Sequence, residues 1–216
     1  MIEDLEPERA RHADDGTDAP RPVLVWRSPE PFRCASSASV GGGVGDRAWV
    51  LNAEVALDYH HEPVEHIARI GGELGLPAGW GVGLLTAARV LDVVVRHDDE
   101  RVGCAATVGV STPTWAAAPD GSWSRWAPGT INLVCWLPAP LSDAALVNAV
   151  VTATEAKSQA LLEGGVPGTG TASDAVAVCC PPGGSEPYAG PRSTWGARLA
   201  RAVHAAVTAG LPGFRT

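Results

Sequence analysis

One predicted helix, residues 142–162, carries the side chains whose spacing most suggests chemistry. Asn148, Thr152, Glu155 and Gln159 follow one another at intervals of four, three and four residues, which places them along one helix face. A solvent-facing stripe usually carries several charges, whereas short uncharged polar groups dominate here. We therefore expect the stripe to face a cavity, with Glu155 as a carboxylate that could activate water. An ordinary solvent-facing stripe is the alternative.

Lys157 lies on the same helix and offers a further titratable group. It could donate a proton to a leaving amine, or it could pair with a carboxylate. It projects about 200° around the helix from Glu155, so the two side chains cannot easily face one site.

The segment after this helix, residues 165–174, is rich in glycine and threonine. Glycine permits a ligand to approach the backbone closely, and Asp174 at the start of the next strand could also activate water. The Thr171 hydroxyl could attack a carbonyl directly. A plain helix-to-strand turn is the alternative, because glycine and threonine are common in turns. The substrate contacts expected from this turn are Gly168, Thr169 and Gly170.

A short apolar strand, residues 130–137, contains two polar residues on one side, Thr130 and Asn132. Thr130 could bind substrate or attack a carbonyl, and Asn132 could hold an oxyanion. An asparagine in an apolar strand must find partners, so a satisfied core residue is the other interpretation.

The eight tryptophans suggest a large, flat ligand. Trp115, Trp123, Trp126 and Trp195 fall in predicted loops or at a helix start, where broad apolar rings can line a binding site. We take Trp115 and Trp195 as candidate substrate contacts.

Fingerprints of several other chemistries are missing from the sequence. The glycine run at residues 41–45 lacks both the GxGxxG and GK[ST] spacings, and there is no GxSxG elbow or HExxH helix. His60, His61, Glu62 and His66 could hold a divalent metal, but neighbours in sequence rarely converge on one ion. We therefore predict no metal site and no cofactor.

The composition favours a cytoplasmic protein that binds neither nucleic acid nor membrane. The 216 residues carry a net charge of −8, whereas binding to nucleic acid requires clustered basic side chains. Five cysteines without a CxxC pair suggest free thiols in a reducing compartment, and no apolar run is long enough to span a bilayer. No feature of the sequence specifies an oligomeric state.

The order of predicted elements indicates an α+β fold with a mixed, largely antiparallel sheet packed against helices. Residues 1–22 are charged and proline-bearing, so we expect a disordered extension before one domain at residues 23–216. Residues 83–95 and 168–180 share a rhythm of glycine, threonine-alanine and an apolar strand. This rhythm suggests a β-β-α-β pseudo-repeat, although chance similarity would also explain it.

Seven distinctive segments follow one another after about residue 32. They are SSASVGGG (36–43), GLLTAA (83–88), ATVGVS (106–111), PGTIN (128–132), LSDAALVNAVVTATEAKSQAL (141–161), GTGTASDAVAV (168–178) and AGPRSTWGARLARAV (189–203). In this order they closely resemble the adenosylcobinamide amidohydrolase family of corrinoid salvage. Thr112 stands where relatives are expected to carry Asn, and residues 115–126 look like a local elaboration; both departures bear on substrate preference.

The resemblance implies hydrolysis of the secondary amide that joins the corrin ring to aminopropanol in adenosylcobinamide. The products would be aminopropanol and adenosylcobyric acid, which can re-enter cobamide synthesis. The corrinoid would be a small-molecule substrate, and binding must select one amide among several. Two other classes stay open at this point: a non-catalytic corrinoid-binding protein, and a self-processing amidase with a threonine nucleophile.

Overall fold

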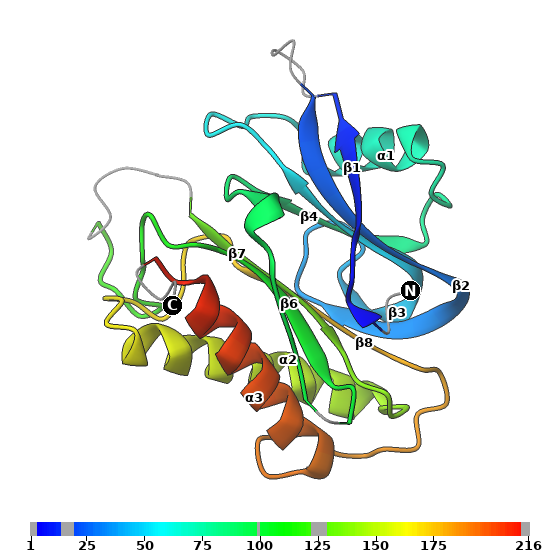
Figure 1. The fold of residues 1–216 in the computed structure, drawn as a ribbon, viewed down its shortest axis with the longest axis vertical. Helices are drawn as coiled ribbons and strands as arrows, with labels where there is room; N and C mark the ends of the chain where they lie inside the picture. Colours follow the sequence, from blue (N-terminus) through cyan, green and yellow to red (C-terminus); the bar gives the residue numbers. More distant parts are fainter. Residues whose placement is uncertain (1–3, 14–19, 99, 122–128, 213–216) are drawn as a thin grey trace.

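The computed structural model describes residues 4–13, 20–98, 100–121 and 129–212 and contains one mixed sheet with three α-helices. The strands run in the order β4-β3-β2-β8-β7-β6-β5, and β1 pairs with β2 outside this path. The β3–β4 and β7–β8 pairs are parallel and the other pairs are antiparallel. This confirms the predicted α+β class (Figure 1). The elements are β1 (Glu8–His12), β2 (Arg21–Ser36), β3 (Gly43–Glu54), α1 (Pro63–Glu73), β4 (Gly81–Thr86), β5 (Val94–His97), β6 (Gly103–Gly109), β7 (Thr130–Trp136), α2 (Asp143–Glu163), β8 (Ala175–Cys180) and α3 (Thr194–Gly210).

The long strand β2 joins two halves of the sheet. Its pairing with β3 shifts register between Arg27 and Phe32, and such a shift bends a strand and increases its twist. The first half of β2 also pairs with β1, and its last residues pair with β8. As a result, one face of β3 and β4 lies over one face of β6 and β7, and we call these the inner faces of the sheet. A hydrogen bond between the side chains of Asn52 on β3 and Thr107 on β6 joins them.

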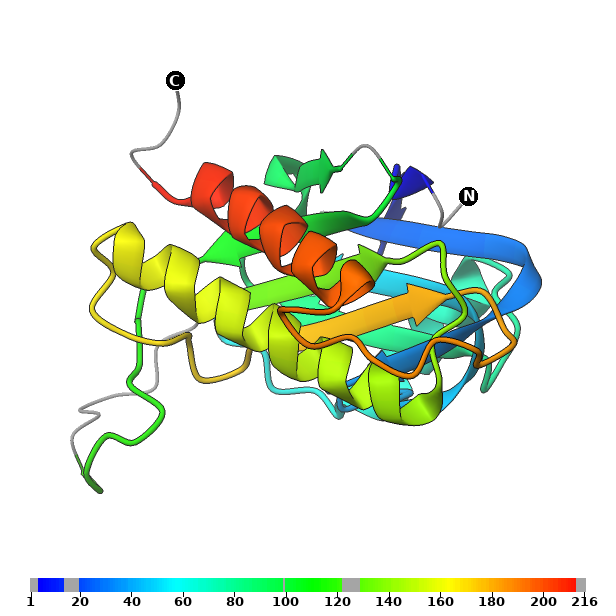
Figure 2. The same cartoon turned by 90° about the horizontal axis from the view of Figure 1, so that it is seen from below.

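Three apolar cores follow from this bend. The largest lies between α2, α3 and the outer faces of β6, β7 and β8, and Figure 2 shows both helices running across that face. A second core, with Trp26, Val134 and Trp136, fills the space between the two halves of the sheet. A third core packs α1 against β3 and β4.

Strand β7 is the buried centre of the fold, as its sequence predicts. Ile131, Leu133 and Cys135 face α2 and α3, whereas Val134 and Trp136 face the inner core. Because side chains alternate along a strand, Asn132 faces the inner core as well. The predicted placement of Thr130 and Asn132 on one side of the strand is confirmed, since both line one cavity.

The expectation that residues 1–22 form a disordered extension is wrong for the part that the structure describes. Residues 8–12 form β1, and Leu5 is completely buried. The indole of Trp26 donates a hydrogen bond to the Leu5 carbonyl at 2.9 Å. Leu5 therefore packs in the inner core together with Trp26. The charge and proline content of residues 1–22 do not reveal this contact. Residues 1–3 and 14–19 lie outside the described residues.

Two segments follow the order β-β-α-β, namely β2-β3-α1-β4 and β6-β7-α2-β8, and each ends with two parallel neighbouring strands. An internal repeat of the sequence stays a prediction. Before β5, Val90–Asp92 forms a turn of 3-10 helix.

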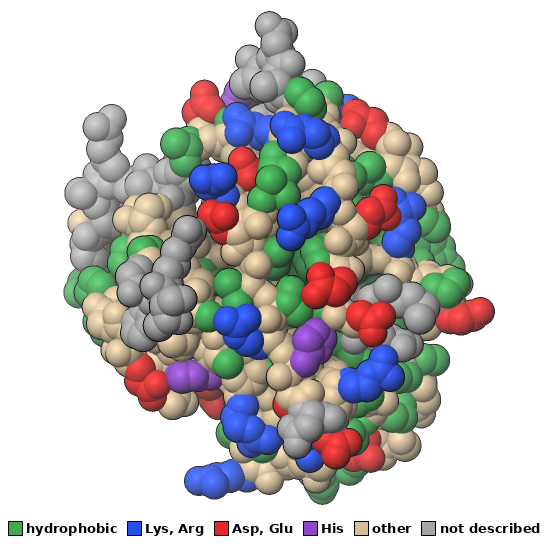
Figure 3. All heavy atoms as spheres, viewed as in Figure 1, with side chains coloured by type: hydrophobic (Ala, Val, Ile, Leu, Met, Phe, Trp, Pro, Cys, Tyr) green, Lys and Arg blue, Asp and Glu red, His purple; other side chains and the backbone are tan. Residues whose placement is uncertain are grey.

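No helix among the described residues is long and apolar enough to span a membrane. The surface of the face in Figure 3 carries acidic and basic side chains side by side, without a large patch of either sign.

Candidate active site

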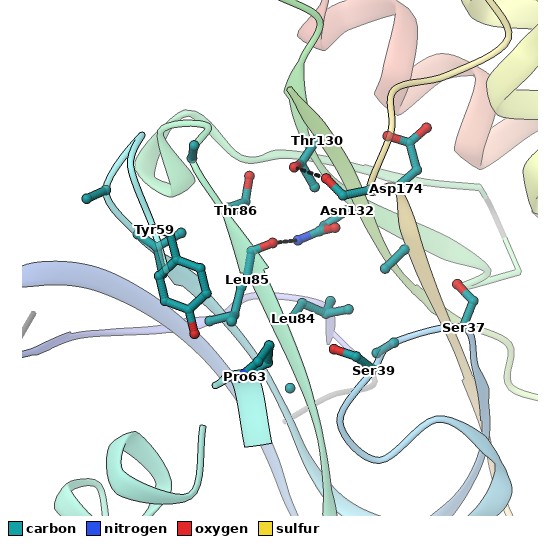
Figure 4. A pocket seen from close by; sticks show the side chains of 17 residues that line it. Ser37, Ser39, Tyr59, Pro63, Leu84, Leu85, Thr86, Thr130, Asn132 and Asp174 are labelled. Atoms are coloured by element: carbon teal, nitrogen blue, oxygen red, sulfur yellow. Dashed lines mark hydrogen bonds between the residues drawn. The ribbon is translucent and has the colours of Figure 1, made fainter. Parts of the chain in front are cut away.

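A cavity of about 380 Å³ opens where the segment after β3 and the last residues of β4 approach the first residues of β7 and β8. Its walls combine an apolar surface from β4 with polar side chains from β7, the turn before β8 and the turn after β2. Figure 4 shows Tyr59 and Asp174 on opposite sides of it, with Asn132 between them. The lining polar side chains are Ser37, Ser39, Tyr59, Thr86, Thr130, Asn132, Ser173 and Asp174.

A network of buried amides and hydroxyls lies at the base of this cavity. Asn132 Nδ2 donates to Asn52 Oδ1 at 2.9 Å and to the Leu85 carbonyl at 3.1 Å. Asn52 Nδ2 then donates to Thr107 Oγ1 at 3.0 Å. These three side chains are at most 2% exposed. The network therefore ties β3 and β4 to β6 and β7 through polar contacts inside an otherwise apolar core.

One atom of this network has no partner. Asn132 Oδ1 is buried and accepts no hydrogen bond from the described residues. Leaving a buried acceptor unpaired costs on the order of 1–3 kcal/mol, so such an atom in a cavity wall points to a ligand.

Two hydroxyl groups meet on the cavity wall next to this network. Thr130 Oγ1 and Ser173 Oγ lie 2.8 Å apart, and Ser173 also contacts the Gly129 carbonyl at 3.3 Å. Because a hydroxyl can donate and accept, this pair can contact a carbonyl oxygen or orient a water molecule.

Asp174 and Lys157 form a buried ion pair behind the cavity. Their side chains are 10% and 7% exposed, and Lys157 Nζ donates to Asp174 Oδ2. Asp174 also accepts hydrogen bonds from Ile131 N at 2.9 Å and from Thr171 N at 3.1 Å, with the Thr171 hydroxyl at 2.5 Å. A carboxylate offers about four acceptor positions, so Asp174 has little capacity left to bind and activate water.

The glycines of the turn before β8 allow the close packing around this ion pair. A Cβ at Gly170 would collide with Asp174 Oδ2 and with Lys157 Nζ, and a Cβ at Gly168 would lie 2.7 Å from the Thr114 carbonyl. Thr169 accepts a hydrogen bond from Ala116 N at 3.1 Å, and Thr171 Oγ1 contacts the Gly129 carbonyl at 2.6 Å. None of these four residues lines the cavity. In this turn the glycines and threonines hold the chain closely packed.

The expectation that the stripe on α2 faces a cavity together with Asp174 is wrong. Asn148, Glu155 and Gln159 are exposed, and Gln159 donates to Glu163 at 2.8 Å on the helix surface. Thr152 is buried, but it donates to the Ala189 carbonyl before α3. Small alanines, rather than the polar stripe, form the buried face. The other side of the helix reaches Asp174, through Lys157.

The candidate tryptophans do not line the cavity either. Trp115 is half-exposed in the segment after β6, and Trp195 packs against the core beneath α2 and α3. Trp123 and Trp126 lie outside the described residues.

Sequence reasoning missed several residues of the site. Asn52 has the same signal as Asn132, a lone amide in an apolar stretch of a strand. Tyr59 forms one wall of the cavity, and its hydroxyl lies 3.1 Å from His66 Nδ1.

Within the described residues no three His, Cys, Asp or Glu side chains gather as metal ligands.

The five cysteines are free, as predicted, and all of them are buried. Burial, followed by a contact with Cys34, raises the pKa of the Cys179 thiol well above its usual value. Burial also raises the pKa of Cys180 to about 11. These two thiols are therefore protonated near neutral pH and are poor nucleophiles.

Four of the distinctive sequence segments converge on the cavity. Segment 36–43 contributes Ser37 and Ser39, and segment 83–88 contributes residues 83–87. Segment 128–132 contributes Thr130 and Asn132, and segment 168–178 contributes residues 173–175. Residues from distant parts of the chain thus surround one small cavity with hydroxyls, an amide and a carboxylate.

The chain is similar to known proteins over nearly its whole length. A family model described as adenosylcobinamide amidohydrolase matches residues 6–213. The chain is 34% identical over 188 residues to an adenosylcobinamide amidohydrolase of Methanosarcina mazei, covering 82% of this chain and 89% of that protein. It is 45% identical over 117 residues to an adenosylcobinamide amidohydrolase of Halobacterium salinarum, covering 51% of this chain and 50% of that protein.

Proposed function

The chain belongs to the adenosylcobinamide amidohydrolase family, and we propose that it hydrolyses the amide between the corrin ring and aminopropanol of adenosylcobinamide. Water adds to the amide carbonyl, the carbon–nitrogen bond breaks, and the nitrogen leaves with a proton as aminopropanol. The corrinoid product is adenosylcobyric acid, which can be used again in cobamide synthesis. The five free thiols support a cytoplasmic location for this reaction.

The observation that carries the proposal is the convergence of four family-like segments on one cavity. A volume of about 380 Å³ is near the lower end of the range for small-molecule sites. We propose that it holds one amide-bearing arm of the corrinoid. In this account the arm enters the cavity and the ring stays at the rim, so one amide among several is selected by position.

The hydroxyl pair is our candidate for contact with the reacting carbonyl. Thr130 and Ser173 lie on the cavity wall, and their oxygens are 2.8 Å apart. One hydroxyl of the pair donates to the other, so the substrate oxygen would receive the hydrogen that Ser173 directs at the Gly129 carbonyl over 3.3 Å. A hydroxyl donor directed at a developing oxyanion lowers the barrier of acyl transfer. Asp174 has a supporting role, because its ion pair with Lys157 and its bonds to Thr171 and Ile131 hold the first residues of β7 and β8 in place.

A turnover assay tests the proposed reaction. Purified protein is incubated with adenosylcobinamide without nucleotide, with and without added divalent metals, and corrinoids are separated by chromatography. We expect adenosylcobyric acid and aminopropanol in equal amounts. Binding without any product, under every metal condition, would support a non-catalytic corrinoid-binding protein and would overturn the proposal. An intact mass below that of the whole chain would instead support self-processing.

A further inference from the structure

We infer that Asn132 presents its side-chain oxygen, and not its nitrogen, to the substrate, and that the site therefore requires an amide that carries an N–H. This inference rests on the proposed function and adds a rule of substrate selection to it. The scissile nitrogen would donate to Asn132 Oδ1 while the hydroxyl pair contacts the carbonyl on the other side of the amide.

The orientation of the Asn132 amide follows from its neighbours. The two ends of an asparagine amide are similar in shape, so their assignment depends on the hydrogen-bond partners. One end lies 3.1 Å from the Leu85 carbonyl, and a main-chain carbonyl can only accept. That end must be Nδ2, which also reaches Asn52 Oδ1. Figure 4 shows the bond from Asn132 to Leu85.

Both hydrogens of Nδ2 are consequently used within the protein. The amide can offer no donor to an oxyanion without giving up Leu85 or Asn52, and each of these acceptors would then be buried and unpaired. This revises the oxyanion-holding role that the sequence suggests for Asn132. The remaining atom, Oδ1, is an acceptor that is buried in a residue only 2% exposed and has no partner among the described residues.

Asn52 and Thr107 are positioning residues for this acceptor. Asn52 Oδ1 accepts from Asn132, and Asn52 Nδ2 donates to Thr107 Oγ1. The chain of bonds runs in one direction from Asn132 through Asn52 to Thr107, and such chains fix the orientation of each member.

Complementary chemistry identifies the ligand group. An unpaired carbonyl-type oxygen accepts from N–H or O–H, and the proposed substrate carries one N–H on its scissile amide. A site built to bond an N–H discriminates strongly against an analogue that lacks it. Secondary amides should therefore be substrates, and tertiary amides of the same shape should not.

The test compares three substrates made by coupling adenosylcobyric acid to different amines. The first is adenosylcobinamide itself, the second carries a methyl group on the amide nitrogen, and the third carries the extra methyl on the carbon next to that nitrogen. The third keeps the N–H and controls for added bulk. With wild-type protein we expect kcat/KM to fall about 10- to 100-fold more for the N-methyl substrate than for the C-methyl substrate.

The Asn132→Leu variant, checked for unchanged folding by circular dichroism, completes the design. It removes the acceptor, so the N-methyl and C-methyl substrates should then differ by no more than about threefold. Equal rates of both methylated substrates with wild-type protein would overturn the inference and leave the proposed function intact. No turnover of adenosylcobinamide itself would overturn both the inference and the proposed function. If Asn132→Leu does not fold, the wild-type comparison decides alone.

Discussion

Two buried polar clusters adjoin the start of β7, and they differ in whether every group has a partner. Around Asp174, a carboxylate accepts hydrogen bonds from Lys157, Thr171 and Ile131 N. Around Asn132, the donor side is fully engaged, but one acceptor is unpaired. Both clusters are almost inaccessible to solvent.

This difference separates structure from function more reliably than residue type does. A carboxylate and a lysine look more reactive than an asparagine. However, a buried charge that is fully paired mainly holds elements together, and removing one partner leaves the other charge uncompensated. An unpaired buried acceptor is the feature that a folded protein does not tolerate without a reason. The comparison predicts stability effects at the first cluster and activity effects at the second.

The largest effect is expected from Lys157→Met. The variant keeps the length of the side chain but leaves Asp174 buried without its cation, which should lower the free energy of unfolding by about 3–5 kcal/mol. Thermal or denaturant unfolding measures this directly. An unchanged stability together with lost turnover would mean that Lys157 acts in catalysis, and the contrast between the clusters would fail.

A smaller loss of stability is expected from Gly170→Ala. Its methyl group would push into the contact between Lys157 and Asp174, at a cost of about 1–3 kcal/mol. Gly72→Ala on α1 is a matched control, since a Cβ there meets no atom within 4 Å. Equal stabilities of the two variants would show that the ion pair tolerates displacement.

A loss of activity without loss of stability is expected from Thr130→Val. The substitution preserves shape and removes the hydroxyl that lies beside Ser173. We expect kcat/KM for adenosylcobinamide to fall about tenfold or more, corresponding to one lost hydrogen bond, with the melting temperature nearly unchanged. Thr130→Ser should restore most of the rate, and a Val variant as active as wild type would remove the hydroxyl pair from the mechanism.

The smallest effect is expected from Glu155→Gln. Glu155 is exposed on α2, and surface substitutions of this kind usually change stability by less than about 0.5 kcal/mol. Turnover should stay close to that of wild type. A loss of about 100-fold in turnover, which is the scale of a missing general base, would mean that the exposed face of α2 belongs to the active site.

The fold class followed from the sequence because strand and helix signals are local. The apolar run over residues 130–137 marked β7 as a strand. Ser142 was expected to begin α2, where its side chain accepts a hydrogen bond from Ala145 N. The bend of the sheet was not predictable in this way, because it depends on the register shift within β2 and on contacts between distant strands. Leu5 was missed for the same reason, since its partner Trp26 lies in another strand.

For the site, the sequence identified the right segments but not all of the right roles. Thr130, Asn132 and Asp174 do lie at one cavity, because strand periodicity fixed the side on which Thr130 and Asn132 project. The face of α2 could not be chosen from spacing. Alanine, valine and leucine are spread around this helix, so it has little apolar asymmetry. The stripe with Glu155 therefore looked as suited to a cavity as the side that carries Lys157.

The most direct test of the account is the rate constant kcat/KM for adenosylcobinamide in an Ala87→Trp variant. Ala87 is half-buried and lines the cavity, so an indole there should fill the space for the substrate arm without entering the core. Thr154→Trp, on the exposed face of α2, is the matched control. We expect release of adenosylcobyric acid to fall more than about 100-fold in Ala87→Trp, because the amide can no longer be positioned, while Thr154→Trp stays near wild type. Wild-type turnover by a folded Ala87→Trp variant would contradict the assignment of this cavity as the active site.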